Sequence, residues 1–427
     1  EYLRQRGCEP DRIILIATDQ AESSTPPEQR SKDTIHFAEL AKQKLQAQFR
    51  LGGEVVHVRL IRRENPALYD EMHDYFRELL TGGWKVLAGV TECWVAPVGG
   101  TPAANTGLLL AAVEVYGRAC RAIYLRADAS RPVELDIGRT FQRAFARQQA
   151  SRLLRANQFQ AARDVMANAD CDVICLAMAE YCARRLNFDF AGAGAALDDA
   201  VRRAEPAGRR LLERAQDEAE KLARGADAAA LVHELAFSAT ALWANGAYRD
   251  FMTRLIGVEE VSGRHIVHTC LPPLDYTADH PGARERRLEV IATAPDLQVY
   301  LDGRTVDGAP LRYEIANTRT VKELIGYILA ERPMRPAEWT VTPEKRAGVA
   351  LARGVLGRIA RLGGIRNELV HGFGGVSRED IEAAHRQAGG NGDVVADMWR
   401  LVEAATGRTR ASWLVDELKQ EILARLG

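Results

Sequence analysis

Short apolar runs alternate with amphipathic segments from residue 12 to about residue 140. The apolar runs predict strands and the amphipathic segments predict helices. In chain order, strand and helix alternate over Arg12–Ala17, Ser31–Phe49, Glu54–Ile61, Pro66–Leu80, Glu92–Val98, Pro102–Tyr116 and Arg121–Arg126. Continuous apolar strands separated by helices are typical of a parallel sheet covered on both faces. The pattern therefore predicts an α/β, Rossmann-like domain over residues 1–140.

Two of the predicted strands end in polar or glycine-rich sequence. The residues are Thr18, Asp19 and Gln20 after the first strand, and Gly99, Gly100, Thr101 and Asn105 after the third. Ligands of parallel sheets bind beyond the carboxyl ends of the strands, and glycines let backbone amides approach a phosphate. These positions are therefore candidate ligand-binding residues. The alternative is that Gly-Gly-Thr-Pro simply makes a good turn into a helix, with Thr101 as the N-cap.

Two familiar nucleotide-binding patterns are missing. GxGxxG does not follow the first strand, which disfavours a dinucleotide-dependent dehydrogenase. GxxxxGK[ST] is also absent, so the chain is not a P-loop NTPase.

Helical periodicity replaces the alternating pattern after residue 140. Alanine, arginine and leucine dominate up to about residue 260, which predicts a helical connector over residues 141–283, with a protein-docking surface as the alternative. The runs Leu288–Ala292 and Leu297–Leu301, followed by Asp302 and Gly303, predict a small β-hairpin near 288–315. Helices resume at about residue 320, so residues 284–427 are predicted to form an all-α domain that contains the hairpin as an insertion.

Charge and cysteine usage exclude several classes of protein. The 427 residues include 57 Lys and Arg against 58 Asp and Glu, so no global field indicates a nucleic-acid or membrane partner. The seven cysteines include no CxxC pair, which favours a reducing cytoplasm, and Cys171, Cys175 and Cys182 are expected to be buried small residues rather than zinc ligands. No apolar run of about 18 residues occurs, so we expect neither secretion nor a membrane span.

Arg366, Asn367 and His371 form the strongest candidate for catalysis. They lie on a short predicted helix bounded by glycines. Asn367 and His371 are four residues apart and share a helix face, which the long Arg366 side chain can also reach. An imidazole moves protons near neutral pH, an amide can orient it, and a guanidinium matches phosphate, so the set suits phosphodiester chemistry without a metal.

The specificity of this motif comes from the asparagine. Arg-x4-His alone is expected about once by chance in this composition, and the adjacent asparagine lowers that expectation to roughly one in fifty. The surrounding sequence is basic, with eight Lys or Arg against three acids between Arg332 and His371. This local excess predicts a phosphate-binding groove in an otherwise neutral protein.

Arg366-Asn367-x3-His371 in an all-α C-terminal domain resembles the HEPN ribonuclease motif. A Rossmann-like domain with Thr18-Asp19-Gln20 after its first strand and Gly99-Gly100-Thr101 before a helix resembles the CARF domain. Their order, joined by a helical connector, resembles the CARF-HEPN ribonucleases that accompany type III CRISPR systems.

The resemblance implies a function. Such proteins bind a cyclic oligoadenylate across a dimer interface, and binding activates metal-independent cleavage of single-stranded RNA. The implied catalytic residues are Arg366, Asn367 and His371 from both subunits of a homodimer, which leave a 2′,3′-cyclic phosphate. Thr18, Asp19, Gln20, Gly99, Gly100, Thr101 and Asn105 would line the activator pocket, with no cofactor and no metal.

Two other functions remain as alternatives. A non-catalytic cyclic-nucleotide sensor with an inert helical domain would bind the same ligand without RNA turnover. A metal-dependent nuclease is disfavoured, because no acidic cluster lies near Arg366 in the sequence.

Overall fold

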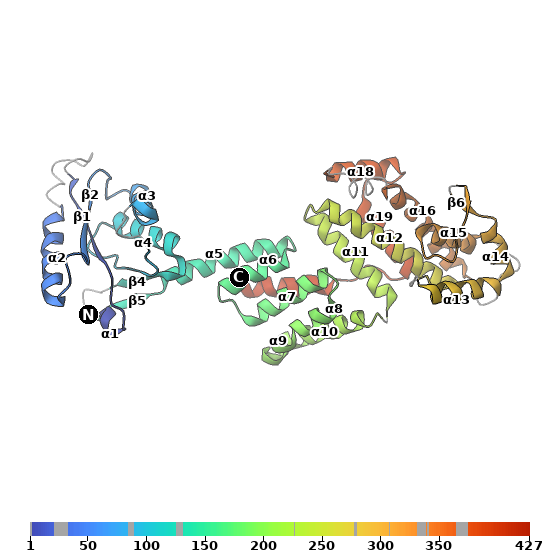
Figure 1. The fold of residues 1–427 in the computed structure, drawn as a ribbon, viewed down its shortest axis with the longest axis horizontal. Coiled ribbons are helices and arrows are strands. Elements are labelled where there is room, and N and C mark those ends of the chain that lie inside the picture. The colour runs from blue at the N-terminus through green and yellow to red at the C-terminus, as the bar shows by residue number, and fades with distance from the viewer. Residues whose placement is uncertain are drawn as a thin grey trace. The chain divides into compact units, whose positions relative to one another are not determined.

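The structure is a computed structural model of the chain. It describes residues 2–20, 33–83, 89–124, 131–225, 227–276, 280–306, 308–330, 339, 341–363 and 375–427. The chain divides into two compact units, Glu1–Gln148 and Gln149–Gly427 (Figure 1). The first unit contains the predicted α/β domain, residues 1–140, and the first residues of the predicted connector. The rest of the connector and the predicted C-terminal domain fall in the second unit.

The first unit contains the predicted alternation of strands and helices. In chain order its elements are α1 (Tyr2–Gln5), β1 (Ile13–Thr18), α2 (Ile35–Phe49), β2 (Val56–Ile61), α3 (Tyr69–Glu78), β3 (Cys93–Val95), α4 (Pro102–Tyr116), β4 (Cys120–Tyr124) and β5 (Val133–Leu135). A π-helical turn, Leu79–Gly83, extends α3, and a 3₁₀ turn, Gly117–Ala119, precedes β4. Strands β1 and β2 are parallel, as are β3 and β4.

The sheet of the first unit differs from the expectation in two respects. In the part of the chain that the structure describes, the strands form two sheets, β1–β2 and β3–β4–β5, instead of one. Strand β5 runs antiparallel to β4 and was not predicted. It has only three residues, which are too few to show an alternating pattern in the sequence.

Helices α3 and α4 pack closely against each other. The buried side chains between them include Met72 and Phe76 on α3 and Ala103 and Ala111 on α4. A Cβ atom on Gly107 would lie 2.8 Å from the carbonyl carbon of Met72. Only glycine therefore lets the backbones of α4 and α3 approach this closely.

The second unit is almost entirely helical. Its helices are α5 (Ile137–Arg155, which begins in the first unit), α6 (Phe159–Asn168), α7 (Val173–Leu186), α8 (Phe190–Ala196), α9 (Asp198–Arg203), α10 (Pro206–Ala223), α11 (Ala228–Ala244), α12 (Tyr248–Cys270), α13 (Pro281–Ala292), α14 (Pro295–Asp302), α15 (Thr318–Leu329), α16 (Pro343–Arg361), α18 (Arg378–Gln387), α19 (Val394–Thr406) and α20 (Leu414–Leu426). The helical character predicted for residues 141–283, and again from about residue 320, is confirmed.

The two strands predicted near residues 288–301 are wrong, because both segments are helices. Leu288–Ala292 ends α13, and Leu297–Leu301 lies within α14. In α14 the buried residues Leu297, Tyr300 and Leu301 have helical spacing, and both helices begin with a proline, which suits the first helical position. The hairpin is reduced to β6 (Thr305–Val306) and β7 (Ala309–Pro310).

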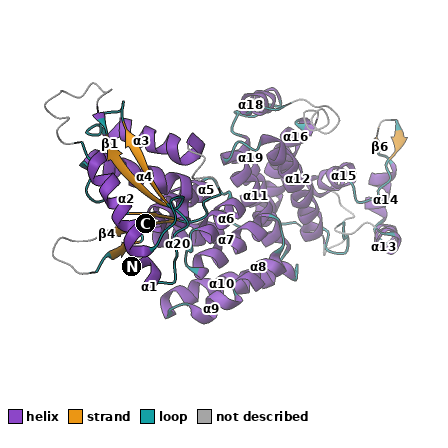
Figure 2. Ribbon diagram, turned by 60° about the vertical axis from the view of Figure 1, so that its left-hand side comes forward, coloured by secondary structure: helices purple, strands orange, loops and turns teal. Residues whose placement is uncertain are grey.

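Residues far apart in the sequence meet in the second unit. Helices α12, α16 and α19 pack together, and the last helix, α20, packs against α7 (Figure 2). Cys182 of α7 is fully buried, and its Sγ lies 3.9 Å from the carbonyl oxygen of Val415 on α20. Cys175 is buried as expected, and Cys171 is partly buried. No helix among the described residues is long and apolar enough to cross a membrane.

Candidate functional site

The chain segments that follow β1 and β2 meet the start of α4 at one place in the first unit. Gln20 Nε2, beyond β1, donates hydrogen bonds to the carbonyl oxygens of Ile61 (3.2 Å) and Glu64 (3.1 Å), at and after the end of β2. Thr101 Oγ1, at the start of α4, donates to the carbonyl oxygen of Pro66. The structure therefore brings the two groups of predicted ligand residues together through the segment after β2.

Two of the three candidates after β1 have structural roles. The backbone N–H of Thr18 donates to Thr34 Oγ1 and that of Thr34 donates to Thr18 Oγ1, each at 3.1 Å, which ties β1 to the start of α2. The Gln20 side chain is 2% exposed and bonded as described above. These side chains shape the segment after β1 rather than present free groups to a ligand.

Asp19 is the accessible candidate after β1. Its Oδ2 lies 3.3 Å from Nε of Arg62, whose side chain is half exposed. Arg62 and Arg63 follow the second apolar run directly and were not selected from the sequence. Ligands bind beyond the carboxyl ends of parallel strands, so the two arginines could have been selected from the sequence. They follow the end of β2 just as Asp19 follows the end of β1.

The turn into α4 has the geometry expected of a capped helix. Gly99 has a φ of +84°, which favours glycine. Thr101 Oγ1 accepts a hydrogen bond from the backbone N–H of Ala104 (3.1 Å), and Asn105 Nδ2 donates to the carbonyl oxygen of Gly100 (3.3 Å). A Cβ on Gly100 would lie 2.9 Å from Asn105 Oδ1. The N-terminus of this 15-residue helix thus presents backbone N–H groups and the positive end of its dipole, which favour an anion.

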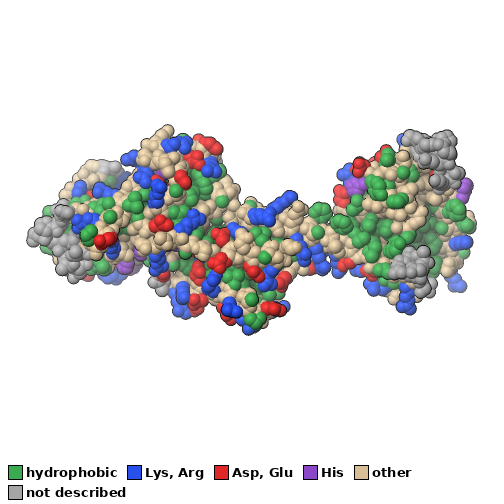
Figure 3. Space-filling view, turned by 180° about the vertical axis from the view of Figure 1, so that it is seen from behind, with side chains coloured by type: hydrophobic (Ala, Val, Ile, Leu, Met, Phe, Trp, Pro, Cys, Tyr) green, Lys and Arg blue, Asp and Glu red, His purple; other side chains and the backbone are tan. Residues whose placement is uncertain are grey.

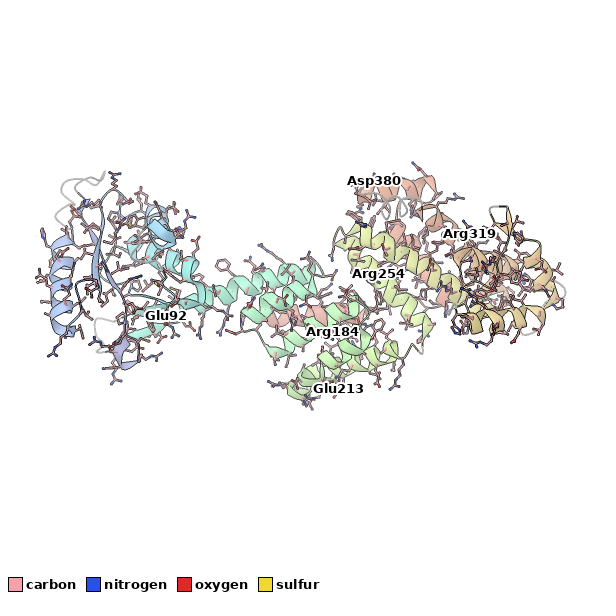
Figure 4. All side chains as sticks on the ribbon, in the orientation of Figure 1. Glu92, Arg184, Glu213, Arg254, Arg319 and Asp380 are labelled. Atoms are coloured by element: carbon pink, nitrogen blue, oxygen red, sulfur yellow. The ribbon has the colours of Figure 1, made fainter. Side chains whose placement is uncertain are left out.

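The predicted catalytic residues Arg366, Asn367 and His371 lie outside the described residues. The described chain reaches residue 363 after α16 and resumes at residue 375 before α18. The start of α18 is fixed by a capping box, in which the N–H of Asp380 donates to Ser377 Oγ (3.2 Å) and the N–H of Ser377 donates to Asp380 Oδ2 (2.9 Å; Asp380 is labelled in Figure 4).

An open groove of about 490 Å³ lies between α16 and the end of α18. Arginine and glycine dominate its lining, which consists of Ala350, Arg353, Gly354, Gly357, Arg358, Arg361, Ala388 and Gly389. The predicted basic segment thus contributes three arginines to one groove. Elsewhere, on the face shown in Figure 3, Lys and Arg side chains are interspersed with Asp and Glu, as the net charge of −1 implies.

A buried carboxylate holds one of the groove arginines. Asp397 Oδ2 accepts hydrogen bonds from Arg358 Nε (2.6 Å) and His385 Nε2 (3.0 Å), and its Oδ1 accepts one from Arg400 Nη1 (3.1 Å). Burial by itself raises the pKa of Asp397, but these bonds outweigh it and hold the pKa below its usual value. The carboxylate form of Asp397 is therefore favoured in the folded protein.

Sequence reasoning missed this cluster. Asp397 and His385 are almost completely buried, and their side chains meet only because α18 and α19 pack together. Gly390 permits the packing, since a Cβ there would lie 2.4 Å from His385 Nε2. No spacing in the sequence marks the pair. In the part of the chain that the structure describes, no group of three or more His, Cys, Asp or Glu side chains could hold a metal ion.

Comparison with known proteins gives a match in structure alone. No model of a known protein family and no characterised protein matches the sequence. Among solved structures, the chain is similar to Enterococcus italicus Csm6 bound to cyclic hexa-2′-fluoro-hexa-dAMP. The TM-score is 0.57 at 14% sequence identity, and the match covers 98% of this chain and 93% of that one. The resemblance to CARF-HEPN proteins noted from the sequence is therefore confirmed at the level of the fold.

Proposed function

We propose that the chain is an endoribonuclease of type III CRISPR antiviral defence, which a cyclic oligoadenylate activates and which cleaves single-stranded RNA without a metal ion. The observation that carries the proposal is the similarity, over 98% of the chain, to a Csm6 structure that holds a cyclic hexanucleotide. Arg366-Asn367-x3-His371 supplies a second, independent argument, because it comes from the sequence and not from the fold.

The activator binds to the first unit, at the N-terminus of α4 and the end of β1. Backbone N–H groups at Gly99 and Gly100 and the helix dipole attract its phosphates. Asn105, near the start of α4, and the ion pair of Asp19 with Arg62, on the turns after β1 and β2, offer donors and acceptors to ribose or adenine. Thr18, Gln20 and Thr101 keep these turns in place through the hydrogen bonds described above.

Cleavage is an internal transfer at phosphorus. The 2′-oxygen of the RNA attacks the adjacent phosphorus as its proton is removed, and the 5′-oxygen of the next nucleotide leaves as it gains a proton. The product ends in a 2′,3′-cyclic phosphate, and no water is consumed. His371 moves the protons, Asn367 orients the imidazole, and Arg366 stabilises the negative charge that develops on the phosphoryl oxygens.

Two subunits supply the cleavage site. A single chain provides one Arg366 and one His371. Cleavage at one phosphate needs both a base and an acid, and two arginines stabilise its developing charge better than one. An isologous homodimer brings two copies of the motif to one cleft.

The test is cleavage of a fluorophore–quencher single-stranded RNA in EDTA, with and without cyclic tetra- or hexa-adenylate. We expect cleavage only with an activator, and a loss of about 10²- to 10⁴-fold in the His371→Ala variant, because general acid–base catalysis contributes this much. Binding of the activator should not change in that variant. Activator binding without RNA cleavage would contradict the proposal and indicate the non-catalytic sensor, and full activity of His371→Ala would refute the catalytic assignment.

A further inference from the structure

We propose that the groove between α16 and the end of α18 binds the phosphodiester backbone of the RNA substrate. Arg353, Arg358 and Arg361 contact its phosphates, and Asp397 is a positioning residue that orients Arg358. This inference rests on the proposed ribonuclease function and assigns it a substrate-binding surface.

The groove exists because one face of α16 lacks side chains at its centre. Residues 350, 354, 357 and 361 follow one another at intervals of three or four and therefore lie on one face of the helix. Two of these positions are glycines. A Cβ at Gly357 would meet nothing within 4 Å, and one at Gly354 would meet only Arg358 Nη1, at 3.8 Å. The polynucleotide backbone can therefore approach the helix closely between flanking arginines.

The groove is lined by three positive side chains and no acidic one. Arg353 is exposed, and no hydrogen bond or ion pair of its side chain occurs in the described part of the chain. Arg361 uses Nη1 to donate to the carbonyl oxygen of Ala388 (3.1 Å), which leaves donors of its guanidinium for a ligand. Three guanidinium groups along one groove match a row of phosphates.

Arg358 is held in place before any ligand arrives. Its Nε donates to buried Asp397 at 2.6 Å, while the residue also lines the groove. Asp397 is itself fixed by His385 and Arg400. Because the arginine is already oriented, binding a phosphate immobilises little additional side-chain freedom. The two arginines on Asp397 outnumber its single negative charge, so the groove keeps a positive potential.

The groove is close in sequence to the predicted catalytic motif. Arg361 ends α16 five residues before Arg366. The basic groove and the predicted catalytic motif therefore belong to one stretch of the sequence, which is why we assign the groove to the substrate of that motif.

The binding test measures fluorescence anisotropy of a labelled single-stranded RNA between 50 and 300 mM KCl, in a His371→Ala background that prevents cleavage. Each phosphate contact makes the logarithm of the binding constant fall by about 0.7 for every ten-fold rise in salt. At 0.1 M salt, compared with 1 M, one contact is therefore worth about five-fold in affinity. We expect Arg353→Gln and Arg361→Gln each to lose about this much, and the double variant to lose about 25-fold. The matched control is Arg210→Gln, an exposed arginine on α10, for which we expect no change.

The positioning role is tested with Asp397→Asn in the active protein. We expect KM for RNA to rise about three- to ten-fold while kcat stays the same, because the Arg358 phosphate contact is loosened and the reacting groups are not. A role confined to stability would lower the unfolding temperature and leave KM unchanged at 25 °C, and that result would overturn the positioning assignment.

The outcomes separate the two proposals. If the wild-type protein cleaves RNA when activated but Arg353→Gln and Arg361→Gln bind RNA like the Arg210→Gln control, the groove inference is overturned and the proposed function stands. If the wild-type protein neither binds nor cleaves RNA with either activator, both are overturned.

Discussion

Glu234→Gln should lower the unfolding free energy of the second unit by more than the same substitution of an exposed glutamate. Glu234 on α11 receives two hydrogen bonds from Arg185 on α7, at 2.9 and 2.8 Å. The single N–H of Trp413 Nε1, just before α20, is shared between both carboxylate oxygens of Glu234, each at 3.2 Å. Both members of the pair are almost completely buried. Glutamine has nearly the same shape but no charge, so the substitution leaves the Arg185 guanidinium without its buried counter-charge.

The magnitude follows from the environment of Arg185. Burial lowers the pKa of this guanidinium, but Glu234, Tyr181 and Glu218 raise that pKa by more than burial lowers it, so the guanidinium stays charged in the folded protein. In the variant, Glu218 is the one acidic partner of Arg185 left among the described residues, and its side chain is 43% exposed. Breaking a buried ion pair on one side costs about 3–5 kcal/mol, which corresponds to roughly 6–20 °C in unfolding temperature for a unit of this size.

The assay is thermal unfolding followed by circular dichroism at 222 nm. The matched control is Glu220→Gln on α10, which also removes a glutamate that pairs with an arginine, but one whose side chain is 61% exposed. An exposed pair of this kind is expected to shift the unfolding temperature by less than about 2 °C. If Glu234→Gln shifts it no more than the control, the packing of α7, α11 and the start of α20 around this pair is refuted.

Three further predictions concern the other features. The pKa of Asp397 is lowered in the folded protein, so its ionisation stabilises the fold above its unfolded pKa of about 4, and this contribution is lost as the pH falls through the lower folded value. In urea titrations, the difference in unfolding free energy between the wild type and Asp397→Asn should therefore be smaller at pH 3 than at pH 6. An equal difference at both pH values would contradict the direction of the pKa shift. Thr101→Ala removes the N-cap of α4 and the hydrogen bond to Pro66. It should lower the unfolding free energy by about 1 kcal/mol and weaken activator binding, measured by calorimetry. Unchanged affinity for the activator would show that the turn does not shape the pocket. Gly107→Ala forces α3 and α4 apart, and should destabilise the first unit by roughly 1–3 kcal/mol in the same titrations, whereas Gly53→Ala, whose Cβ meets nothing within 4 Å, should have little effect.

Local patterning determined much of the first unit. Continuous apolar runs mark β1 and β2, and Pro102 through Tyr116 forms α4 with the bounds expected from the sequence, because Thr101 and Pro102 give a strong start signal. The pattern could not show that Gln20 is buried. Its carbonyl partners at Ile61 and Glu64 lie more than 40 residues away in the chain, and only the pairing of β1 with β2 brings them to the amide.

The segment 288–301 shows where patterning fails. Short runs such as Leu297–Leu301 are apolar enough for either a strand or a helix, and periodicity over five residues does not separate the two. The neighbours decided the outcome, because Leu297, Tyr300 and Leu301 are buried together on one face of α14.

The sequence by itself determined the helical character of the second unit, the basic segment around α16 and the motif Arg366-Asn367-x3-His371, since each depends on residues close together in the chain. Only the tertiary structure decided that Arg353, Arg358 and Arg361 line one groove, and that buried Asp397 and His385 support it. The physical reason is the same in each case. A burial or a hydrogen bond between side chains on different helices depends on how those helices pack, and that packing is set by contacts across the whole unit rather than by any local pattern.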